Sequence, residues 1–453
     1  MKRRLLTLLS LLLLVFSLSA QTPAEVRSMI ERYHNLTIPT YSTYPPIPLG
    51  EVADAPRGYE PFYISHFGRH GSRYELGSKA QKRLLVTLEK ADSLNLLTDV
   101  GKQALGYVRE AYAKQQGNNG QLSALGAKQL REMGARTAQN FPEVFRNGGV
   151  INARSSDRQR CKDSRENFVK SLCEAYPALK VENSSTEQDM LIMRPLERRD
   201  KSLYTEEMAD AHRTHARRGD WRKLRKEWGD EQDFTSALRV ITHSPEQFLA
   251  ATKSHSFHFM HRLFSILHFA LNFEVGSDEF LSQIYTDEQR YTMYLFSSFA
   301  NVCYYGSEGH PYMDLRQACM RPLIEDIISY GDKAVKGENG DTVAHLRFSH
   351  DTYFIPLVIA LGYDGYKPKY MERDIVGAAT SVNYSMMIPM GASFQMVFYR
   401  NRRGNVLVRT LINEQDATLP IKSSTAPFYR WEELREYFQK RMAELDKVSG
   451  LVK

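Results

Sequence analysis

Short apolar runs alternate with amphipathic repeats along the first third of the chain. The run FYISHF, residues 62–67, is followed by a polar turn with glycine, and it predicts a β-strand. Apolar residues recur at helical spacing over residues 79–94 and 122–141, and residues 150–176 predict a short strand, a polar turn and a helix. This alternation of strands and helices is typical of an α/β core.

The middle of the chain has a different pattern. Strand signals are sparse between about residue 175 and residue 330, where long, highly charged helical patterns dominate. A strand is predicted again at residues 342–350, followed by a helix from Asp351 and a hairpin over residues 393–414. We therefore expect one discontinuous α/β core that is interrupted by a helical insertion.

The first twenty residues have the layout of a secretory signal peptide. Lys2, Arg3 and Arg4 precede a mostly apolar run from Leu5 to Leu18, and small residues allow cleavage after Ala20. The alternative is an uncleaved N-terminal anchor, but this run is short for a membrane span. The expected location is periplasmic or secreted, without stable membrane insertion after cleavage. The predicted segments are a signal peptide (1–20), a discontinuous core (21–170 and 331–453) and a helical insertion, or cap, domain (171–330).

Charge excludes one large class of partners. The formal net charge of +7 falls to +4 when residues 1–20 are removed with their three basic side chains. A mildly basic chain of this kind lacks the profile of a nucleic-acid-binding protein.

The four cysteines leave the disulfide pattern open. Cys161 and Cys173 lie on one predicted helix, roughly 18 Å apart at the usual helical rise, which is too far to bridge. A Cys303–Cys319 bond and buried thiols are equally compatible with the sequence.

Candidate catalytic residues lie where three predicted strands end. Arg69, His70 and Arg73 follow the first strand, His350 and Asp351 follow a strand some 280 residues later, and Arg160 lies in a third strand-to-helix turn. Ligands of α/β sheets bind at the carboxyl ends of the strands. These six side chains therefore predict a single site.

The residue types at this site suit phosphoryl transfer. Arginine guanidinium groups bind phosphate oxygens in pairs, and neighbouring positive charges keep a histidine neutral and nucleophilic. Asp351 is the available acid for the departing alkoxide. Such a cluster can work by position and charge alone, so we expect no cofactor and no catalytic metal.

Several motifs resemble those of a known family. RHGSR (69–73) is similar to the RHGxR signature of the histidine acid phosphatases, branch two of the histidine phosphatase superfamily, and FSHDT (348–352) resembles their distal His-Asp pair. RQRCKDSRENF (158–168), LSALGAKQL (122–130) and LVRTLINEQDATLPI (407–421) resemble the multiple inositol polyphosphate phosphatases, or histidine phytases. The resemblance implies a phosphoglycerate-mutase-like α/β core with the inserted helical domain.

The resemblance also implies roles for individual residues. His70 would be the nucleophile and Asp351 the proton donor, while Arg69, Arg73, Arg160 and His350 would bind the transferred phosphate. Two positions depart from the family pattern. Glu75 stands where many members have proline, and Thr352 stands where the inositol polyphosphate subgroup has the glutamate of a His-Ala-Glu sequence.

Other candidates have simpler explanations. Arg154 is the alternative to Arg160 as the third phosphate-binding arginine. His66 with His70 does not suit a metal, because the site would compete with the arginines. His255, His258 and His261 recur every three residues of a predicted helix, and we favour the boundary of a buried helix over a metal site.

The most basic stretch, residues 212–228, predicts either a solvated helix face or a positive rim that attracts a polyphosphate. The candidate rim residues are Arg213, Arg217, Arg218, Arg222 and Lys223.

The expected function is a secreted or periplasmic phosphomonoesterase that acts on an anionic small molecule, inositol hexakisphosphate (phytate) and its lower phosphates, through a phosphohistidine. The alternatives are a broad-specificity acid phosphatase, a mutase-like transferase and a non-catalytic protein that binds phosphorylated ligands.

Overall fold

The computed structural model describes residues 22–50, 53–197, 219–305, 311–371 and 373–449, together with residues 210 and 214. The predicted signal peptide lies outside these residues and stays a prediction. Within them, no helix combines the length and apolar character that a membrane crossing requires.

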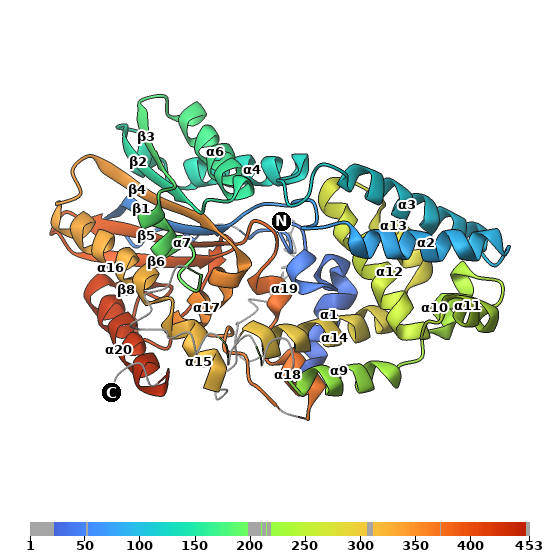
Figure 1. Ribbon diagram of the computed structural model, residues 1–453. Helices are drawn as coiled ribbons and strands as arrows, with labels where there is room; N and C mark the ends of the chain where they lie inside the picture. Colours follow the sequence, from blue (N-terminus) through green and yellow to red (C-terminus); the bar gives the residue numbers. More distant parts are fainter. Residues whose placement is uncertain are drawn as a thin grey trace, which may run out of the picture.

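A mixed sheet of eight strands lies at the centre of one half of the molecule (Figure 1). The strands are β1 (Tyr59–Arg69), β2 (Gly149–Ser155), β3 (Leu179–Ser184), β4 (Thr342–Ser349), β5 (Ser393–Asn401), β6 (Val406–Ile412), β7 (Gln415–Asp416) and β8 (Phe428–Arg430). Their order is β3-β2-β4-β1-β5-β6-β7, and β8 pairs with β6. Strands β1 to β4 are parallel, so their carboxyl ends meet at one edge, whereas β5 and β6 form the predicted antiparallel hairpin.

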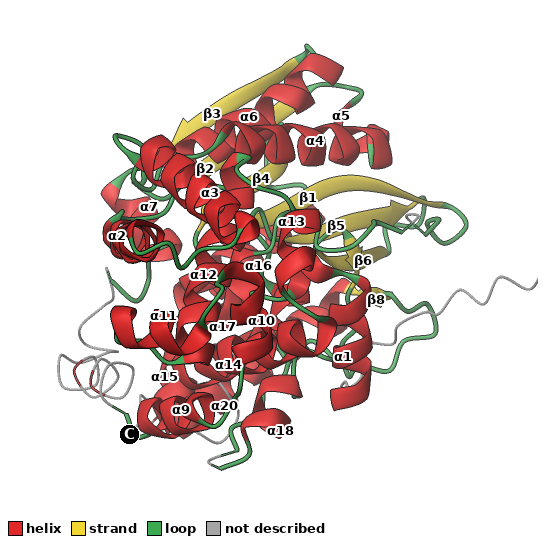
Figure 2. Ribbon diagram, turned by 90° about the vertical axis from the view of Figure 1, so that its right-hand side faces the viewer, coloured by secondary structure: helices red, strands yellow, loops and turns green. Residues whose placement is uncertain are grey.

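Helices cover both faces of this sheet (Figure 2). One face packs against α4 (Ala124–Asn140), α5 (Pro142–Phe145) and α6 (Gln159–Ala175). The other packs against α7 (Glu187–Met193), α15 (Pro311–Ala318), α16 (Arg321–Lys336), α17 (Asp351–Leu361) and α20 (Trp431–Ser449). Because side chains alternate along a strand, Ile64 of β1 faces the first layer while Tyr63 and Phe67 face the second.

The other half of the molecule is helical (Figure 1). It contains α2 (Lys79–Ser93), α3 (Asp99–Gln115), α9 (Trp221–Asp230), α10 (Thr235–Ile241), α11 (Pro245–Thr252), α12 (Ser256–Ala270), η3 (Leu271–Phe273) and α13 (Asp278–Ile284). The long helix α14 (Asp287–Tyr305) contributes to the hydrophobic cores of both halves. The remaining short elements are α1 (Pro23–Arg32), η1 (His34–Leu36), η2 (Pro39–Tyr41), α18 (Ile375–Thr380) and α19 (Tyr384–Met387).

The predicted α/β class is confirmed, and the structure divides the chain differently from the predicted segments. Strand β3 lies within the predicted insertion but pairs with β2 at the edge of the sheet. Helices α2 and α3 lie within the predicted core segment but pack in the helical half, where Leu88 and Val108 share a core with Phe257. The apolar face of a helix packs against another element with a matching apolar surface. The order of the elements along the chain does not specify which element this is.

All four cysteines are thiols in the structure, so the buried-thiol alternative applies to Cys303 and Cys319. Cys161 and Cys173 lie on α6, as predicted, and are not joined.

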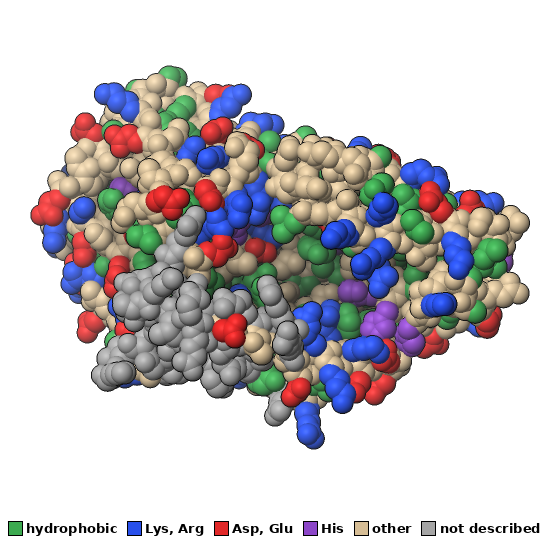
Figure 3. All heavy atoms as spheres, in the orientation of Figure 1, with side chains coloured by type: hydrophobic (Ala, Val, Ile, Leu, Met, Phe, Trp, Pro, Cys, Tyr) green, Lys and Arg blue, Asp and Glu red, His purple; other side chains and the backbone are tan. Residues whose placement is uncertain are grey.

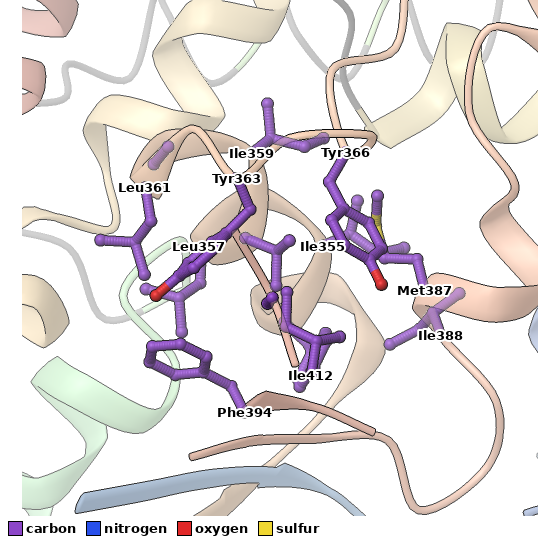
Figure 4. Packing of buried hydrophobic residues seen from close by; sticks show 14 of the residues in the cluster. Ile355, Leu357, Ile359, Leu361, Tyr363, Tyr366, Met387, Ile388, Phe394 and Ile412 are labelled. Carbon is purple, nitrogen blue, oxygen red and sulfur yellow. The ribbon is translucent and has the colours of Figure 1, made fainter. Parts of the chain in front are cut away.

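Helix α17 is anchored in the largest hydrophobic core. Ile355 and Leu357 lie among Tyr363, Phe394 and Ile412, which come from the following segment and from strands β5 and β6 (Figure 4). All five side chains are fully or almost fully buried. Because α17 begins at Asp351, this packing fixes a catalytic candidate at the sheet edge.

Candidate active site

Backbone hydrogen bonds fix the position of His70. Arg69 is the last residue of β1, and His70 follows it. The amide of His70 donates to the carbonyl of Ser349 at the end of β4 (3.0 Å), and its own carbonyl accepts from the amide of Gly391 (2.8 Å). The predicted meeting of the β1 and β4 ends is therefore confirmed.

Gly71 is required because the turn packs against the backbone of α4. A Cβ on Gly71 would lie 2.7 Å from the carbonyl oxygen of Gly126 and 2.6 Å from Leu130 Cδ2. The converse holds for Gly126, whose added Cβ would lie 2.0 Å from the carbonyl oxygen of Ser72. The segment LSALGAKQL thus contributes a glycine that allows the nucleophile turn to approach the helix.

Polar side chains from elements that are far away in the sequence form hydrogen bonds to the same turn. The amide of Gly71 donates to Ser164 Oγ of α6 (3.1 Å), and the amide of Ser72 donates to Gln129 Oε1 of α4 (3.0 Å). Ser72 Oγ donates to Asn272 Oδ1 of η3 (2.7 Å). Our sequence reasoning missed these supporting residues, although Gln129 lies in the family-like segment and Ser164 in the segment with the third arginine.

The hydrogen bonds of His70 define its tautomer. Its Nδ1 lies 2.9 Å from the carbonyl oxygen of Gly71, and because a carbonyl only accepts, Nδ1 carries the proton. The neutral ring then has its lone pair on Nε2. Burial, followed by the charge of Arg160 and of the two motif arginines, holds the pKa of His70 well below its ordinary value. The site therefore provides a neutral, nucleophilic imidazole.

Arg69 is buried and held by backbone carbonyls. Its guanidinium donates to the carbonyls of Ile388 (2.7 Å) and Thr40 (3.0 Å). One nitrogen also lies 3.4 Å from Asp351 Oδ2. Its orientation is thus determined by the fold rather than by solvent.

Arg73 and Arg160 approach from two other directions. Arg73 donates to the carbonyl of Tyr74 (2.8 Å) and lies over the Phe269 ring at 5.4 Å. Burial lowers the pKa of Arg73 to about 10. Arg160, in the first turn of α6, places one guanidinium nitrogen 3.3 Å from His350 Nδ1.

The three guanidinium groups retain hydrogen-bonding capacity. The Nε atoms of Arg69, Arg73 and Arg160 are buried and lack a hydrogen-bond partner among the described residues. Buried arginines elsewhere share this feature, but these three also act electrostatically on the same histidine, His70. Their convergence is suited to an anion with several oxygens.

Neighbouring arginines of β2 and α6 have other contacts. Arg154 forms a two-pronged ion pair with Asp326 (3.0 and 2.8 Å), and Arg165 donates to a backbone carbonyl at the end of β3 (2.9 Å). Arg158 is largely exposed, 3.9 Å from an aspartate carboxylate. The structure therefore favours Arg160, rather than Arg154, as the third arginine.

His350 is neutral and oriented from two sides. Arg160 can only donate, so His350 Nδ1 accepts and its Nε2–H donates to Ser156 Oγ (3.1 Å). Burial and the charge of Arg160 lower the pKa of His350 to about 3. Its ring meets that of His70 edge-on, with centroids 5.6 Å apart. His350 therefore lies beside His70, and both of its ring nitrogens are occupied by Arg160 and Ser156 in the substrate-free protein.

Asp351 begins α17 beside the arginines. Its Oδ1 accepts from the amide of Thr352 (3.0 Å). Burial raises the pKa of Asp351, but the charges of Arg69 and Arg73 outweigh burial, so the net shift is downward. The carboxyl group is ionised as long as nothing neutralises those arginines.

A cleft of about 500 Å³ opens beside this cluster, between α2, α9 and α12. Positively charged and histidine side chains border the hollow between the two halves of the molecule (Figure 3). Its basic lining comprises Arg83, Arg225, Lys226, Arg262, His258 and His261. At one end lie Tyr41 and Glu75, and the Tyr41 hydroxyl is influenced by the charges of Glu75, Arg73 and Asp351. The cleft therefore ends close to the arginine cluster, although none of the six catalytic candidates lines it.

Glu75 adds a titratable group at this junction. Burial, opposed by Arg73, raises the pKa of Glu75 to about 7. The residue that departs from the family pattern thus changes charge near neutral pH.

Only two of the five predicted rim residues lie within the part of the chain that the structure describes. Arg213, Arg217 and Arg218 lie outside the described residues. Arg222 lies over the Trp221 ring at 5.1 Å, and Lys223 is 80 % exposed and lies 3.8 Å from Glu227. The cations of α9 that line the cleft are instead Arg225 and Lys226, about one helical turn further along α9.

The remaining histidine candidates differ in environment. His66 is buried between the rings of Phe168 and Phe348, with centroid distances of 5.0 and 5.2 Å. Burial lowers the pKa of His261 to about 3, and its Nε2 lies 3.2 Å from Ser297 Oγ. Both therefore belong to packed regions. His255 is exposed and His258 partly so, near the end of α9.

A neutral histidine among converging arginines, at the carboxyl edge of an α/β sheet, defines a protein built to handle phosphoryl groups. Residues 68–413 match the model of the histidine phosphatase superfamily (branch 2), and the chain belongs to this superfamily. The protein is a phosphatase.

Solved structures share the fold. The multiple inositol polyphosphate phosphatase of Bifidobacterium longum in complex with inositol hexasulfate is 19 % identical, covers 88 % of this chain and 97 % of its own, and has a TM-score of 0.67. The phytase from D. castellii is 17 % identical, with 93 % and 88 % covered and a TM-score of 0.65. A comparison with curated protein sequences finds no match.

Proposed function

We propose that the protein hydrolyses phosphate monoesters through a phosphohistidine at His70. The observation that carries this proposal is the neutral imidazole whose lone pair is on Nε2, surrounded by three arginines. In the first step Nε2 attacks phosphorus, the bond from phosphorus to the ester oxygen breaks, and the leaving oxygen takes the proton of Asp351. In the second step water attacks phosphorus, Asp351 accepts a water proton, and the P–N bond breaks to release phosphate and restore His70.

The protonation of Asp351 follows from the charge of the substrate. In the free protein the motif arginines keep this carboxyl group ionised. A bound phosphate dianion neutralises much of their charge, while the burial that raises the pKa of the carboxyl remains. Substrate binding therefore favours the protonated carboxyl that the first step needs, close to Arg69 and the transferred phosphate.

The proposed substrates are inositol hexakisphosphate and lower inositol polyphosphates. The transferred phosphate would occupy the arginine cluster, and the adjoining basic cleft would bind the other phosphates of the same molecule. Four lysine or arginine side chains line this cleft, more than a simple monoester requires. The names of the Bifidobacterium longum and D. castellii proteins, which share the fold, agree with this choice.

The location proposed for the protein is periplasmic or secreted. The basic and apolar pattern of residues 1–20 supports it. Mass measurement of the N-terminus of the exported protein tests cleavage after Ala20.

A trapping experiment tests the mechanism. The protein is mixed with an isotopically labelled phosphomonoester and quenched within milliseconds, and the labelled peptide is identified. An acid-labile, alkali-stable label on His70, absent from His70→Ala, supports the proposal. A label on another residue, or hydrolysis by His70→Ala within tenfold of wild type, would falsify it.

A second measurement tests the substrate class. Chromatography of the inositol phosphates formed over time should show a limited set of isomers, because a cleft that binds several phosphates presents few of them to His70. A kcat/KM for inositol hexakisphosphate no higher than for simple sugar phosphates would instead support a broad-specificity acid phosphatase. No phosphate release from either substrate would support a binding protein.

A further inference from the structure

A cluster of three potential metal ligands lies at the outer side of the cleft. Asp230 is the last residue of α9, His255 precedes α12, and His258 lies in the first turn of α12. One ligand atom from each residue lies within 4.8 Å of the other two. The helices that carry them are separated by 25 residues in the chain, so tertiary packing creates this cluster.

The contacts within the cluster orient the ligand atoms. His258 Nε2 lies 2.8 Å from Asp230 Oδ1, while the second carboxylate oxygen accepts from Lys226 Nζ at 2.5 Å. Gly229 makes room for the imidazole, because a Cβ at this position would lie 2.8 Å from His258 Cε1. The end of α9 thus forms a cradle for the ring of His258.

We propose that Asp230, His255 and His258 form a binding site for a divalent transition metal ion, with Zn²⁺ as the expected occupant. Two imidazoles and one carboxylate are a ligand set that Zn²⁺ binds with an additional open position. In a tetrahedral shell with bonds of about 2.0–2.1 Å, neighbouring ligand atoms are about 3.3 Å apart. Binding therefore needs a shift of about 1–2 Å in the exposed His255 side chain and a small separation of His258 from Asp230.

The proposed ligand side chains are reached by solvent, which is typical of an exchangeable metal site rather than of a buried structural one. Asp230 and His255 are exposed, and 28 % of the His258 side chain is accessible, so an ion can enter from solvent. The third histidine of the sequence repeat does not take part, because the His261 ring packs against the rings of Phe257 and Phe296 and its Nε2 lies 3.2 Å from Ser297 Oγ. An aspartate from another helix replaces it, a combination that the histidine spacing alone did not predict.

The site has a consequence for the helical half of the molecule. A metal ion bound to Asp230, His255 and His258 would link the end of α9 to the start of α12. Because His258 also lines the cleft, an open coordination position could face that side. The ion would add positive charge beside Lys226 and stabilise this part of the protein in proportion to its occupancy.

A Co²⁺ titration tests the proposal on the full mature chain without a polyhistidine tag. Visible absorption bands of a four- or five-coordinate Co²⁺ complex are expected at one equivalent, and Zn²⁺ should displace them. Asp230→Asn, His255→Ala and His258→Ala should each weaken binding by about tenfold or more, since each removes one of three ligands. Thermal unfolding should show a metal-dependent rise in midpoint for wild type that these variants lack.

The matched control is His243→Ala, which removes an exposed histidine outside the cluster and should leave Co²⁺ affinity unchanged. Circular dichroism shows whether each variant is folded. Absence of the bands at millimolar Co²⁺, or wild-type affinity in folded His258→Ala, would overturn the proposal. Both readouts are independent of catalysis, so the proposed hydrolysis and the metal site can fail separately.

Discussion

The turn that carries His70 and the cleft face formed by α9 and α12 are both rich in positive charge, but they hold it differently. At the turn, Arg69 is 1 % exposed and donates to two backbone carbonyls, and the turn is pressed against the backbone of α4. On the cleft face, Lys226 and Arg262 are exposed side chains on helix surfaces. The charge at the turn is held in place by backbone contacts, whereas the charge on the cleft face is carried by long side chains that extend into solvent.

The two regions therefore tolerate different changes: the turn depends on exact geometry, and the cleft face depends on net charge. A phosphoryl transfer site needs a fixed geometry, because charge must already be in place where it develops in the transition state. A region that binds distal phosphates needs net charge more than exact position, since its interactions act over several ångströms through water. Substitutions should therefore affect kcat at the turn and KM in the cleft.

Loss of the proton donor should have the largest effect. Asp351→Asn keeps the size of the side chain but removes the acid, so hydrolysis of inositol hexakisphosphate should slow by about 10²–10⁴-fold. The nitrophenolate of p-nitrophenyl phosphate needs little protonation, so its phosphorylation step should slow by less than about tenfold. Single-turnover kinetics with both esters measures this contrast. Equal losses would show that Asp351 does not act as the acid.

A methyl group at the contact between the turn and α4 should have the next largest effect. In Gly126→Ala the new Cβ would lie 2.0 Å from the Ser72 carbonyl oxygen, so the turn must shift. We expect kcat to fall by about 10–100-fold, because small misplacements of reacting groups are costly. Steady-state kinetics and thermal unfolding measure both consequences.

The control is the same substitution at Gly106 of α3, where an added Cβ meets no atom within 4 Å. Gly106→Ala should leave kcat unchanged and stabilise the helix by about 0.5–1 kcal/mol. If both variants retain wild-type kcat, the close contact between the turn and α4 does not determine the catalytic position of His70.

Removal of charge from the cleft should have a smaller effect, mainly on KM. Arg83→Gln with Arg262→Gln should raise KM for inositol hexakisphosphate by about tenfold and leave its kcat within about twofold. The matched control, Lys128→Gln with Lys170→Gln, removes the same charge from exposed positions on α4 and α6. A similar rise in KM in the control would mean that only total charge matters.

Glu75 should have the smallest effect, and it depends on pH. Burial raises the pKa of Glu75 to about 7, so its side chain is neutral below this pH and becomes an anion above it. The anion lies near Arg73 and Tyr41 and repels phosphate, so KM of wild type should rise by a few-fold between about pH 6 and pH 8. Glu75→Gln should lack that rise. Because substrate ionisation affects both proteins equally, the ratio of their KM values isolates the effect, and a constant ratio would contradict it.

Most of the catalytic cluster could be predicted because its residues lie at strand ends. The strands ending at Arg69 and Ser349 have strong apolar patterns, so His70, His350 and Asp351 could be placed at one sheet edge. The choice between Arg154 and Arg160 needed the structure, since only there does Asp326 pair with Arg154.

Local patterns along the chain were enough to predict most elements of the α/β core, the glycine in the RHGSR turn and the chemical types at the ends of β1 and β4, because these follow from short-range periodicity and side-chain chemistry. Strand β3 was missed, because it lies in a segment with weak strand signals. Contacts in the folded protein select which helices share a core, require glycine at position 126, and bring Asp230 rather than His261 to His255 and His258. The physical reason is that such features depend on contacts between segments far apart in the chain. Local patterns specify a surface to be buried, but the partner that buries it is selected only when all the surfaces pack together.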